Sequence, residues 1–414
     1  MTTRVLLLIP TTSYRAADFL DAARGLDVEV VVGSDQPPVL EHVSPGRSLW
    51  VNMANPEAGA SDTEAFAREY PIDAIVPVDD AGTLVAATAA KRLGLPHNPL
   101  GAVEATRNKG LMRERLEAGS LPSPWWEVVS LDQDARAIAE RAQNTRYPCV
   151  LKPLALSASR GVIRANDADE FGAAFERIRA LLRDPEVTAD CGDTADSLLV
   201  EGFIPGVEVS LEGLLTDGRL IPLALFDKPD PLDGPFFEET IYVTPSRLDQ
   251  ASQDLVVEAA RRSAEALGLR DGPLHAELRL HEGRAWPIDI AARSIGGLCS
   301  RTLSFGTGMS LEEIILRHAT RSPIDSFERE TAAAGVMMIP IPAAGTLRGV
   351  QGIAEAEAVP GIESVTMSIP VSQRVVPLPE GGDYLGFIFA HAEAPAEVEA
   401  ALRTAHAALR FDIA

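Results

Sequence analysis

The sequence predicts a multidomain protein that combines α/β and α+β units. Its 414 residues exceed what one ordinary hydrophobic core holds, so several domains are expected. Strand-like and helix-like segments alternate through the first part of the chain, which favours a parallel sheet. Short strands rich in Gly and Pro, followed by an Ala-rich helix, indicate a small α+β domain at the end. We place the domains at residues 1–105, 106–196, 197–325 and 326–414.

The first unit is expected to be a Rossmann-like parallel α/β domain. Its predicted strands cover residues 4–10, 28–33 and 74–78, and its predicted helices cover residues 14–25 and 81–93. The loop after the first strand, from Pro10 to Arg15, contains no glycine. A dinucleotide fingerprint needs glycines there for close approach to a pyrophosphate, so an NAD-dependent dehydrogenase is disfavoured.

The remaining elements are predicted from apolar periodicity and from turn residues. Helices are expected at residues 108–118, 168–182, 251–267 and 395–409, with a further helix ending near residue 318. Strands are expected at residues 125–129, 149–153, 161–165, 198–204, 207–215 and 220–226, and a hairpin at 275–292. The polar, acidic stretch 184–197 is predicted to be a loop.

Composition excludes several classes of function. The formal net charge of −23 repels nucleic acid at long range. No apolar run reaches the length of a membrane span, and the start of the chain has no signal-peptide pattern, so a cytoplasmic enzyme is expected. Cys149, Cys191 and Cys299 have no metal-binding spacing and are expected to be buried thiols.

A lysine at the end of a predicted buried strand, Lys152, is the first chemical signal, because lysine is rarely buried without a partner. The loop of small residues that follows, 154–162, is of a kind that folds over phosphates through backbone N–H groups and hydroxyls. We expect Lys152 to neutralise a nucleotide phosphate, with Ser157, Ser159 and Gly161 in a lid. A surface hairpin whose lysine reaches water is the alternative.

Two glutamates, Glu201 and Glu208, flank a short turn between the next predicted strands. One of them is expected to stand beside an adenine, and the other to accept hydrogen bonds from ribose hydroxyls. Two solvated glutamates at strand ends are the alternative.

The hairpin 275–292 carries two carboxylates that are predicted to face each other. The apolar faces of its strands are expected to consist of Ala276, Leu278 and Leu280 on one strand and Trp286, Ile288 and Ile290 on the other. Matching these faces sets Glu277 opposite Asp289, a register that we attribute to the loop 282–284. Because facing carboxylates repel, a cation between them is expected, and oxygen ligands suit Mg2+ bound with phosphates. A solvated polar face is the alternative.

Together, in this order and rough spacing, the three signals resemble the ATP-grasp superfamily, and most of all its carboxylate–amine ligases, which include bacterial L-amino acid ligases. The similarity covers about residues 106–317, and the stretch 292–301 looks much like that of the amino acid ligases. It implies an ATP-grasp fold between the Rossmann-like and α+β domains. It also implies ATP and one or two Mg2+ ions, which Mn2+ can replace.

The resemblance assigns roles residue by residue. It implies phosphate contacts for Lys109 and Lys152, adenine contacts for Glu201 and the backbone through Phe203, and a ribose contact for Glu208. It implies that Glu277 and Asp289 bind metal and that Arg293 steadies the transferred phosphoryl group. The chain departs from the family where Asp289 replaces the commoner Glu, where Ala291 replaces a metal-binding Asn, and where the phosphate loop keeps only Gly161.

The implied reaction activates a carboxylate as an acyl phosphate and joins it to an amine, releasing ADP and phosphate. Glu238 or Glu239 is expected to bind the ammonium group or take its proton, with Tyr242 standing where some relatives have histidine. Arg301 is expected to pair with a substrate carboxylate, and Asp79 and Asp80 are further candidates for the ammonium role. An ordinary acidic loop is the alternative at Glu238 and Glu239.

Two other classes stay open from the residues alone. One is a ligase that uses thiol, carbamate or bicarbonate chemistry instead of amine chemistry, and the other is a nucleotide-binding homologue without turnover. The expected partners are a small carboxylate and an amine or amino acid, with neither nucleic acid nor membrane. We also allow for a homodimer.

Overall fold

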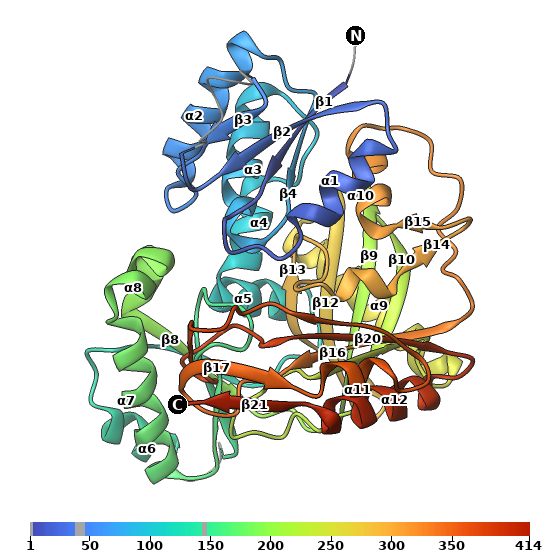
Figure 1. The fold of residues 1–414 in the computed structure, drawn as a ribbon. Coiled ribbons are helices and arrows are strands. Elements are labelled where there is room, and N and C mark those ends of the chain that lie inside the picture. Colours follow the sequence, from blue (N-terminus) through green and yellow to red (C-terminus); the bar gives the residue numbers. More distant parts are fainter. Residues whose placement is uncertain (1–2, 38–45, 143–146) are drawn as a thin grey trace.

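The computed structural model describes residues 3–37, 46–142 and 147–414. Its first unit lies above a long central sheet in Figure 1 and is the expected parallel sheet, in the order β3-β2-β1-β4. The strands are β1 (Thr3–Leu8), β2 (Val28–Ser34), β3 (Ser48–Trp50) and β4 (Ala74–Pro77), and the helices are α1 (Ala16–Arg24), α2 (Pro56–Glu69) and α3 (Asp80–Leu93). Alternate residues of β1 enter two different cores, Val5 and Leu7 in one and Leu6 and Leu8 in the other. Both faces of this sheet are therefore covered, which explains the continuous apolar runs in β1 and β4.

Two helices, α4 (Leu100–Arg107) and α5 (Lys109–Ala118), link the first unit to the rest. Asn108 separates them because its side chain accepts hydrogen bonds from the N–H groups of Gly110 and Leu111 and so caps α5. Met112 and Leu116 share a core with residues of α9 (Gln250–Leu267). This packing fixes Lys109 at the first turn of α5, beside the cleft described below.

A small lobe, drawn in green in Figure 1, contains the four-stranded sheet β5-β8-β6-β7. Its strands are β5 (Trp126–Ser130), β6 (Cys149–Pro153), β7 (Ile163–Ala165) and β8 (Ser197–Gly202), and its helices include α6 (Ala135–Ala142) and α7 (Ala168–Leu182). The loop predicted at 184–197 is wrong: α8 (Pro185–Cys191) and a 3-10 turn (Gly192–Asp196) lie there. Asp184 caps α8 and Pro185 starts it, while Val187 and Cys191 are buried, so capping and burial outweigh the polar composition.

The central sheet has eight strands in the order β13-β12-β9-β10-β11-β16-β20-β18. The strands are β9 (Val207–Thr216), β10 (Arg219–Asp227), β11 (Ile241–Thr244), β12 (Gly272–His281), β13 (Arg284–Ala291), β16 (Ala333–Ile339), β18 (Ile362–Met367) and β20 (Gly386–Ala392). Because β11 pairs with β16, the sheet continues across the predicted boundary after residue 325. The C-terminal unit is thus joined to the preceding domain by backbone hydrogen bonds.

Smaller elements complete the fold. A second sheet of the C-terminal unit has the order β19-β17-β21, and β14 pairs with β15. These elements and the remaining helices are β14 (Ser304–Phe305), β15 (Met309–Ser310), α10 (Leu311–Ala319), β17 (Gly345–Gln351), α11 (Ile353–Glu357), β19 (Arg374–Val375), α12 (Pro395–Ala408) and β21 (Arg410–Ile413). Across the described parts of the chain, no helix combines the length and apolar character needed to cross a membrane.

The pairing of Glu277 with Asp289 in the β12–β13 hairpin is confirmed, but the expected reason for it is partly wrong. The turn consists of Glu282 and Gly283, both with positive φ, and the register shifts at a bulge between Glu277 and Leu278. Trp286 consequently pairs with Arg279 on the polar face instead of joining the apolar one.

Candidate active site

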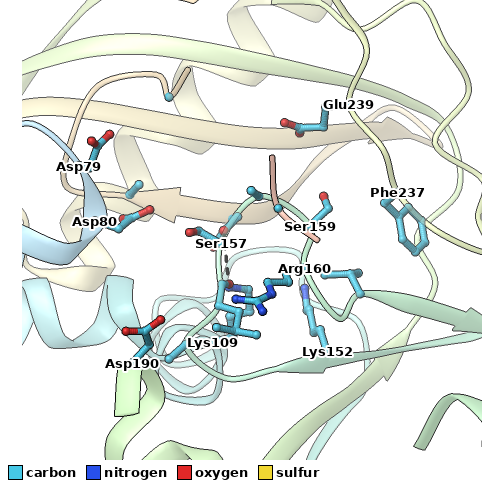
Figure 2. A pocket seen from close by; sticks show the side chains of 18 of the residues that line it. Asp79, Asp80, Lys109, Lys152, Ser157, Ser159, Arg160, Asp190, Phe237 and Glu239 are labelled. Carbon is cyan, nitrogen blue, oxygen red and sulfur yellow. Dashed lines mark hydrogen bonds and ion pairs between the residues drawn. The ribbon is translucent and has the colours of Figure 1, made fainter. Parts of the chain in front are cut away.

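A cleft of about 1600 Å³ opens where the first unit, the small lobe, the central sheet and the C-terminal unit meet. Most residues singled out from the sequence line it: Asp79, Asp80, Lys109, Lys152, Ser157, Ser159, Glu201, Phe203, Glu208, Glu239, Tyr242, Glu277, Asp289 and Arg293. Figure 2 shows Lys109 and Lys152 on one side of the pocket, with Glu239 on the other side and Asp79 and Asp80 at its flank. The fold therefore gathers residues that lie far apart along the chain.

A buried ion network anchors the floor of the cleft beside β6 and β8. The Lys152 ammonium lies 2.5 Å from Oε1 of Glu201, and Arg113 Nε donates to Oε2 of the same carboxylate at 2.6 Å. Burial by itself raises the pKa of Glu201, but Arg113 and Lys152 outweigh it and lower the pKa to about 2. Burial lowers the pKa of Lys152, and Glu201 opposes that effect. Arg113 also donates to the Pro287 carbonyl at 2.7 Å, which joins the small lobe to the hairpin β12–β13.

The lid loop after β6 is held on both sides. Lys109 Nζ donates to the Leu156 carbonyl at 2.7 Å. From the C-terminal unit, the Pro379 carbonyl accepts the Gly161 N–H at 2.8 Å, and the Glu380 carbonyl accepts Arg160 Nε at 2.7 Å. Gly161 thus contacts the C-terminal unit and is not among the residues that line the cleft, whereas Ser157 and Ser159 are.

A lysine that the sequence analysis missed, Lys228, occupies the centre of an acidic cluster at the end of β10. Its ammonium lies 2.9 Å from Oε1 of Glu208 and 3.5 Å from Oε1 of Glu277, and it also contacts Glu239. Burial opposes the charge on Lys228, but the three carboxylates outweigh it and raise its pKa. Glu208 also accepts Arg279 Nε at 2.7 Å, so both of its oxygens already have cationic partners.

The described residues include a set of carboxylates that fits a metal ion. Oxygen atoms of Glu208, Glu239 and Glu277 lie within 4.8 Å of one another. Asp289 faces Glu277 across the hairpin, and its Oδ2 lies 3.8 Å from the Lys109 ammonium. Hard oxygen donors next to phosphate-sized space suit Mg2+. Glu239 is an addition to the pair of metal ligands expected from the sequence.

At the edge contributed by the first unit, Asp80 pairs with two arginines. Arg293 Nη2 donates to Oδ2 of Asp80 at 2.9 Å, and Arg107 lies 3.3 Å from Oδ1. Burial would raise the pKa of Asp80, but the arginines hold it well below its ordinary range. Asp80 at the start of α3 therefore orients Arg293 toward the cleft from a separate domain.

Residues expected to hold the acceptor separate into two groups. Glu239 accepts a hydrogen bond from the Tyr242 hydroxyl at 2.8 Å. Its pKa is raised to about 7, mainly by burial and in second place by the negative charge of Glu277. Glu238 is half-buried beside the backbone of Ile341 and is not among the lining residues. Arg301 pairs with Asp18 of α1 at 2.9 Å and is not among the residues that line the cleft.

Several residues of the site were not predicted from the sequence. For Lys228 a local signal was present, because it comes directly after the largely apolar strand β10, much as Lys152 lies near the end of β6. Arg113, Arg279 and His275 look like ordinary helix or strand residues, because their partners come from distant segments. The C-terminal unit lines the cleft with Arg374, Val376 and residues 380–384, which no motif indicated.

Comparison with known families identifies three segments of the chain. The sequence model of the ATP-grasp domain matches residues 145–302, that of the ATP-grasp N-terminal domain matches residues 20–97, and that of the L-amino acid ligase C-terminal domain 2 matches residues 337–414. The matches follow the order in which the three parts of the fold occur in the chain.

Curated relatives are 26% to 29% identical to this chain over the aligned segments. Alanine–anticapsin ligase of Bacillus subtilis (strain 168) is 29% identical over 264 residues, which is 60% of this chain and 54% of that protein. Carnosine synthase 1 of Gallus gallus is 26% identical over 243 residues, which is 57% of this chain and 26% of that protein. The match spans about half the length of the alanine–anticapsin ligases and less of the carnosine synthase.

One solved structure shares the fold over the full length. An L-amino acid ligase from Bacillus licheniformis superimposes with a TM-score of 0.82 at 24% identity, covering 100% of this chain and 99% of that one. The ATP-grasp fold predicted from the sequence is confirmed.

Proposed function

We propose that this chain, which carries an ATP-grasp domain and an L-amino acid ligase C-terminal domain, is an ADP-forming ligase that joins a carboxylate to an amine. The main support for the proposal is that cationic side chains from two sides and a cluster of carboxylates lie around one cleft. Lys109 and Lys152 line one side, Arg293 enters from another, and Glu208, Glu239 and Glu277 gather around Lys228. The likeness to alanine–anticapsin ligase and carnosine synthase supports an amine acceptor.

In the proposed nucleotide site, Lys109 and Lys152 neutralise ATP phosphates under the lid that contains Ser157 and Ser159. Backbone groups around Phe203 contact the adenine, and the ion pair with Glu201 holds the Lys152 side chain in place. Such a site works by positioning and charge neutralisation, which is how most phosphoryl transfer is catalysed. Glu208, held between Lys228 and Arg279, lies at the proposed ribose end.

In the proposed metal site, Glu277 and Asp289 would hold Mg2+ together with the ATP phosphates, and Glu239 would assist. The metal would supply neutralisation of the phosphate charge. Lys228 already offsets the negative charge of Glu239 and Glu277, and Lys109 lies near Asp289, so this chain supplies a lysine beside each metal-site carboxylate.

The proposed reaction has two steps whose atoms balance. A carboxylate oxygen of the donor attacks the γ-phosphorus, ADP leaves, and an acyl phosphate forms. The amine then attacks the acyl carbon, phosphate leaves with one former carboxylate oxygen, and the amine loses a proton. Arg293 is placed to steady the transferred group. Glu239 is placed to hold the ammonium or take its proton, and a pKa raised to about 7 favours the second role.

ADP release over a matrix of carboxylate donors and amine acceptors tests this function. We expect release that requires one member of each group, with the mass of the amide product appearing in parallel. ADP release that requires no amine, or ATP binding without any release across the matrix, would overturn the proposed ligase.

A further inference from the structure

A carboxylate behind the wall of the cleft, Glu212 on β9, is 1% exposed and has a partner for each oxygen. Its Oε1 contacts Nδ1 of His275, and its Oε2 accepts the backbone N–H of Ile295 at 2.9 Å. A buried carboxylate is costly unless it is paired and hydrogen-bonded, so both contacts are needed to keep it there.

The first contact leads to the proposed metal site. Glu212 lies opposite His275 in the pairing of β9 with β12. The other ring nitrogen of His275, Nε2, lies 3.2 Å from Oε1 of Glu277. His275 therefore bridges two carboxylates, and Glu212 fixes the ring orientation from which it meets Glu277.

The second contact leads to the loop that carries Arg293. Ile295 lies two residues further along that loop, and Arg293 Nη1 donates to the adjoining Ser294 carbonyl at 2.9 Å. From the first unit, Arg15 Nη1 donates to Ser294 Oγ at 2.7 Å and to the Ile295 carbonyl at 2.9 Å. The loop is thus clamped between Glu212 on the central sheet and Arg15 in another domain.

We propose that Glu212 is a positioning residue that ties the metal-side carboxylate of Glu277 to the phosphoryl-side loop of Arg293. The inference rests on the proposed function, which gives Glu277 and Arg293 their roles. Glu212 touches neither substrate nor metal in this arrangement. It sets the relative placement of two groups of the proposed phosphoryl-transfer site, Glu277 through His275 and Arg293 through the Ile295 backbone.

Glu212→Gln tests the link, because an amide cannot accept from His275 and from the Ile295 N–H with both of its atoms. Mn2+ binding in the presence of ADP, followed by electron paramagnetic resonance, is the readout besides turnover. Removing a group that supports a metal ligand typically costs 10–100-fold, so we expect Mn2+ affinity to fall about 10-fold, with ADP affinity without metal unchanged. At saturating Mn2+ we expect kcat to stay reduced, because the NH2 group of the amide cannot accept from one partner and its uncharged oxygen accepts more weakly from the other, so the support of the Arg293 loop weakens as well.

Two further variants separate the halves of the link. His275→Asn keeps the bond from Ile295 to Glu212, so it should weaken Mn2+ binding while lowering kcat at saturating Mn2+ less than Glu212→Gln does. It also decides the metal side if Glu212→Gln fails to fold. Glu312→Gln is the matched control: Glu312 is 2% exposed and pairs with Arg15 at 2.5 Å, and its replacement should leave Mn2+ affinity at the wild-type value.

If folded Glu212→Gln binds Mn2+ with wild-type affinity, the proposed role of Glu212 is overturned. If Glu212→Gln does not fold, wild-type Mn2+ affinity in His275→Asn overturns it instead. Equal losses of Mn2+ affinity in Glu212→Gln and Glu312→Gln would also overturn it, because they would indicate general softening. A wild-type protein that binds Mn2+ with ADP but turns over no carboxylate and amine pair would contradict the proposed function alone. A wild-type protein that binds no Mn2+ with ADP would contradict both.

Discussion

Glu277 on β12 pairs directly with Asp289 on β13, and each carboxylate has a lysine near it. Lys228 lies 3.5 Å from Glu277, and Lys109 lies 3.8 Å from Asp289. The repulsion expected between the two acids is therefore offset by the chain itself, so repulsion is not what demands a metal. The argument for Mg2+ rests instead on the gathering of oxygen donors beside a nucleotide-sized cleft.

Asp289→Asn is expected to raise the Mg2+ concentration needed for half-maximal ADP release by about tenfold, since it removes one anionic oxygen donor. Asp289→Glu should keep part of the activity, and Ala291→Asn should lower the Mg2+ requirement by adding a donor. Titration of ADP release with Mg2+ measures all three. Equal Mg2+ dependence in wild type and Asp289→Asn would remove Asp289 from the metal site.

Lys228→Met is expected to destabilise the protein by about 3–5 kcal/mol, because it leaves buried carboxylates without their shared cation. The loss should shrink when Mn2+ is added, since a metal ion then meets a more negative cluster. Thermal melts with and without Mn2+ measure both effects, and Lys91→Met, on the exposed surface of α3, is the control. A variant that melts at the wild-type temperature without metal would show that Lys228 does not carry this charge balance.

Lys152→Met is expected to weaken ATP binding by about 2–3 kcal/mol through the loss of a charge-assisted phosphate contact. It also leaves Glu201 with Arg113 as its remaining cation, so some loss of stability is expected as well. Calorimetry at constant Mg2+ measures the affinity, and denaturation measures the folded fraction. Unchanged ATP affinity in the folded variant would exclude Lys152 from the phosphate site.

Glu201→Gln tests the stability that the ion network supplies. The pKa of Glu201 is lowered from 4.5 to about 2, so the ionised carboxylate stabilises the fold fully above pH 4.5 and loses that effect as the pH falls toward 2. A shift of this size corresponds to roughly 3 kcal/mol. Urea denaturation should show a difference in the free energy of unfolding between wild type and variant at pH 7, and this difference should be smaller at pH 3. An equal difference in unfolding free energy at both pH values would contradict the stabilising role of the ion network.

The sequence predicted the parts of the site that lie within one strand or one hairpin. Lys152 was found because a lysine ending an apolar strand is unusual, and the pairing of Glu277 with Asp289 followed from alternation along β12. The turn was predicted with the wrong length, and the bulge compensated for it. A bulge depends on backbone geometry that residue type does not fix.

Contacts between distant segments could not be predicted in this way. Arg301 was expected in the cleft but pairs with Asp18, which lies on a helix of another unit. Lys228 precedes a segment rich in proline, and such a segment predicts an irregular loop instead of a site residue. Its role becomes visible only when β9, β10 and β12 bring Glu208 and Glu277 to the same place.

Transfer of a labelled oxygen tests the central claim most directly, which is that a carboxylate is activated as an acyl phosphate. The donor carboxylate carries ¹⁸O, and the phosphate released during turnover with an amine is analysed by mass spectrometry. The account predicts phosphate that contains one ¹⁸O atom from the donor, formed together with ADP. Label that appears in AMP, or phosphate without label, would contradict it.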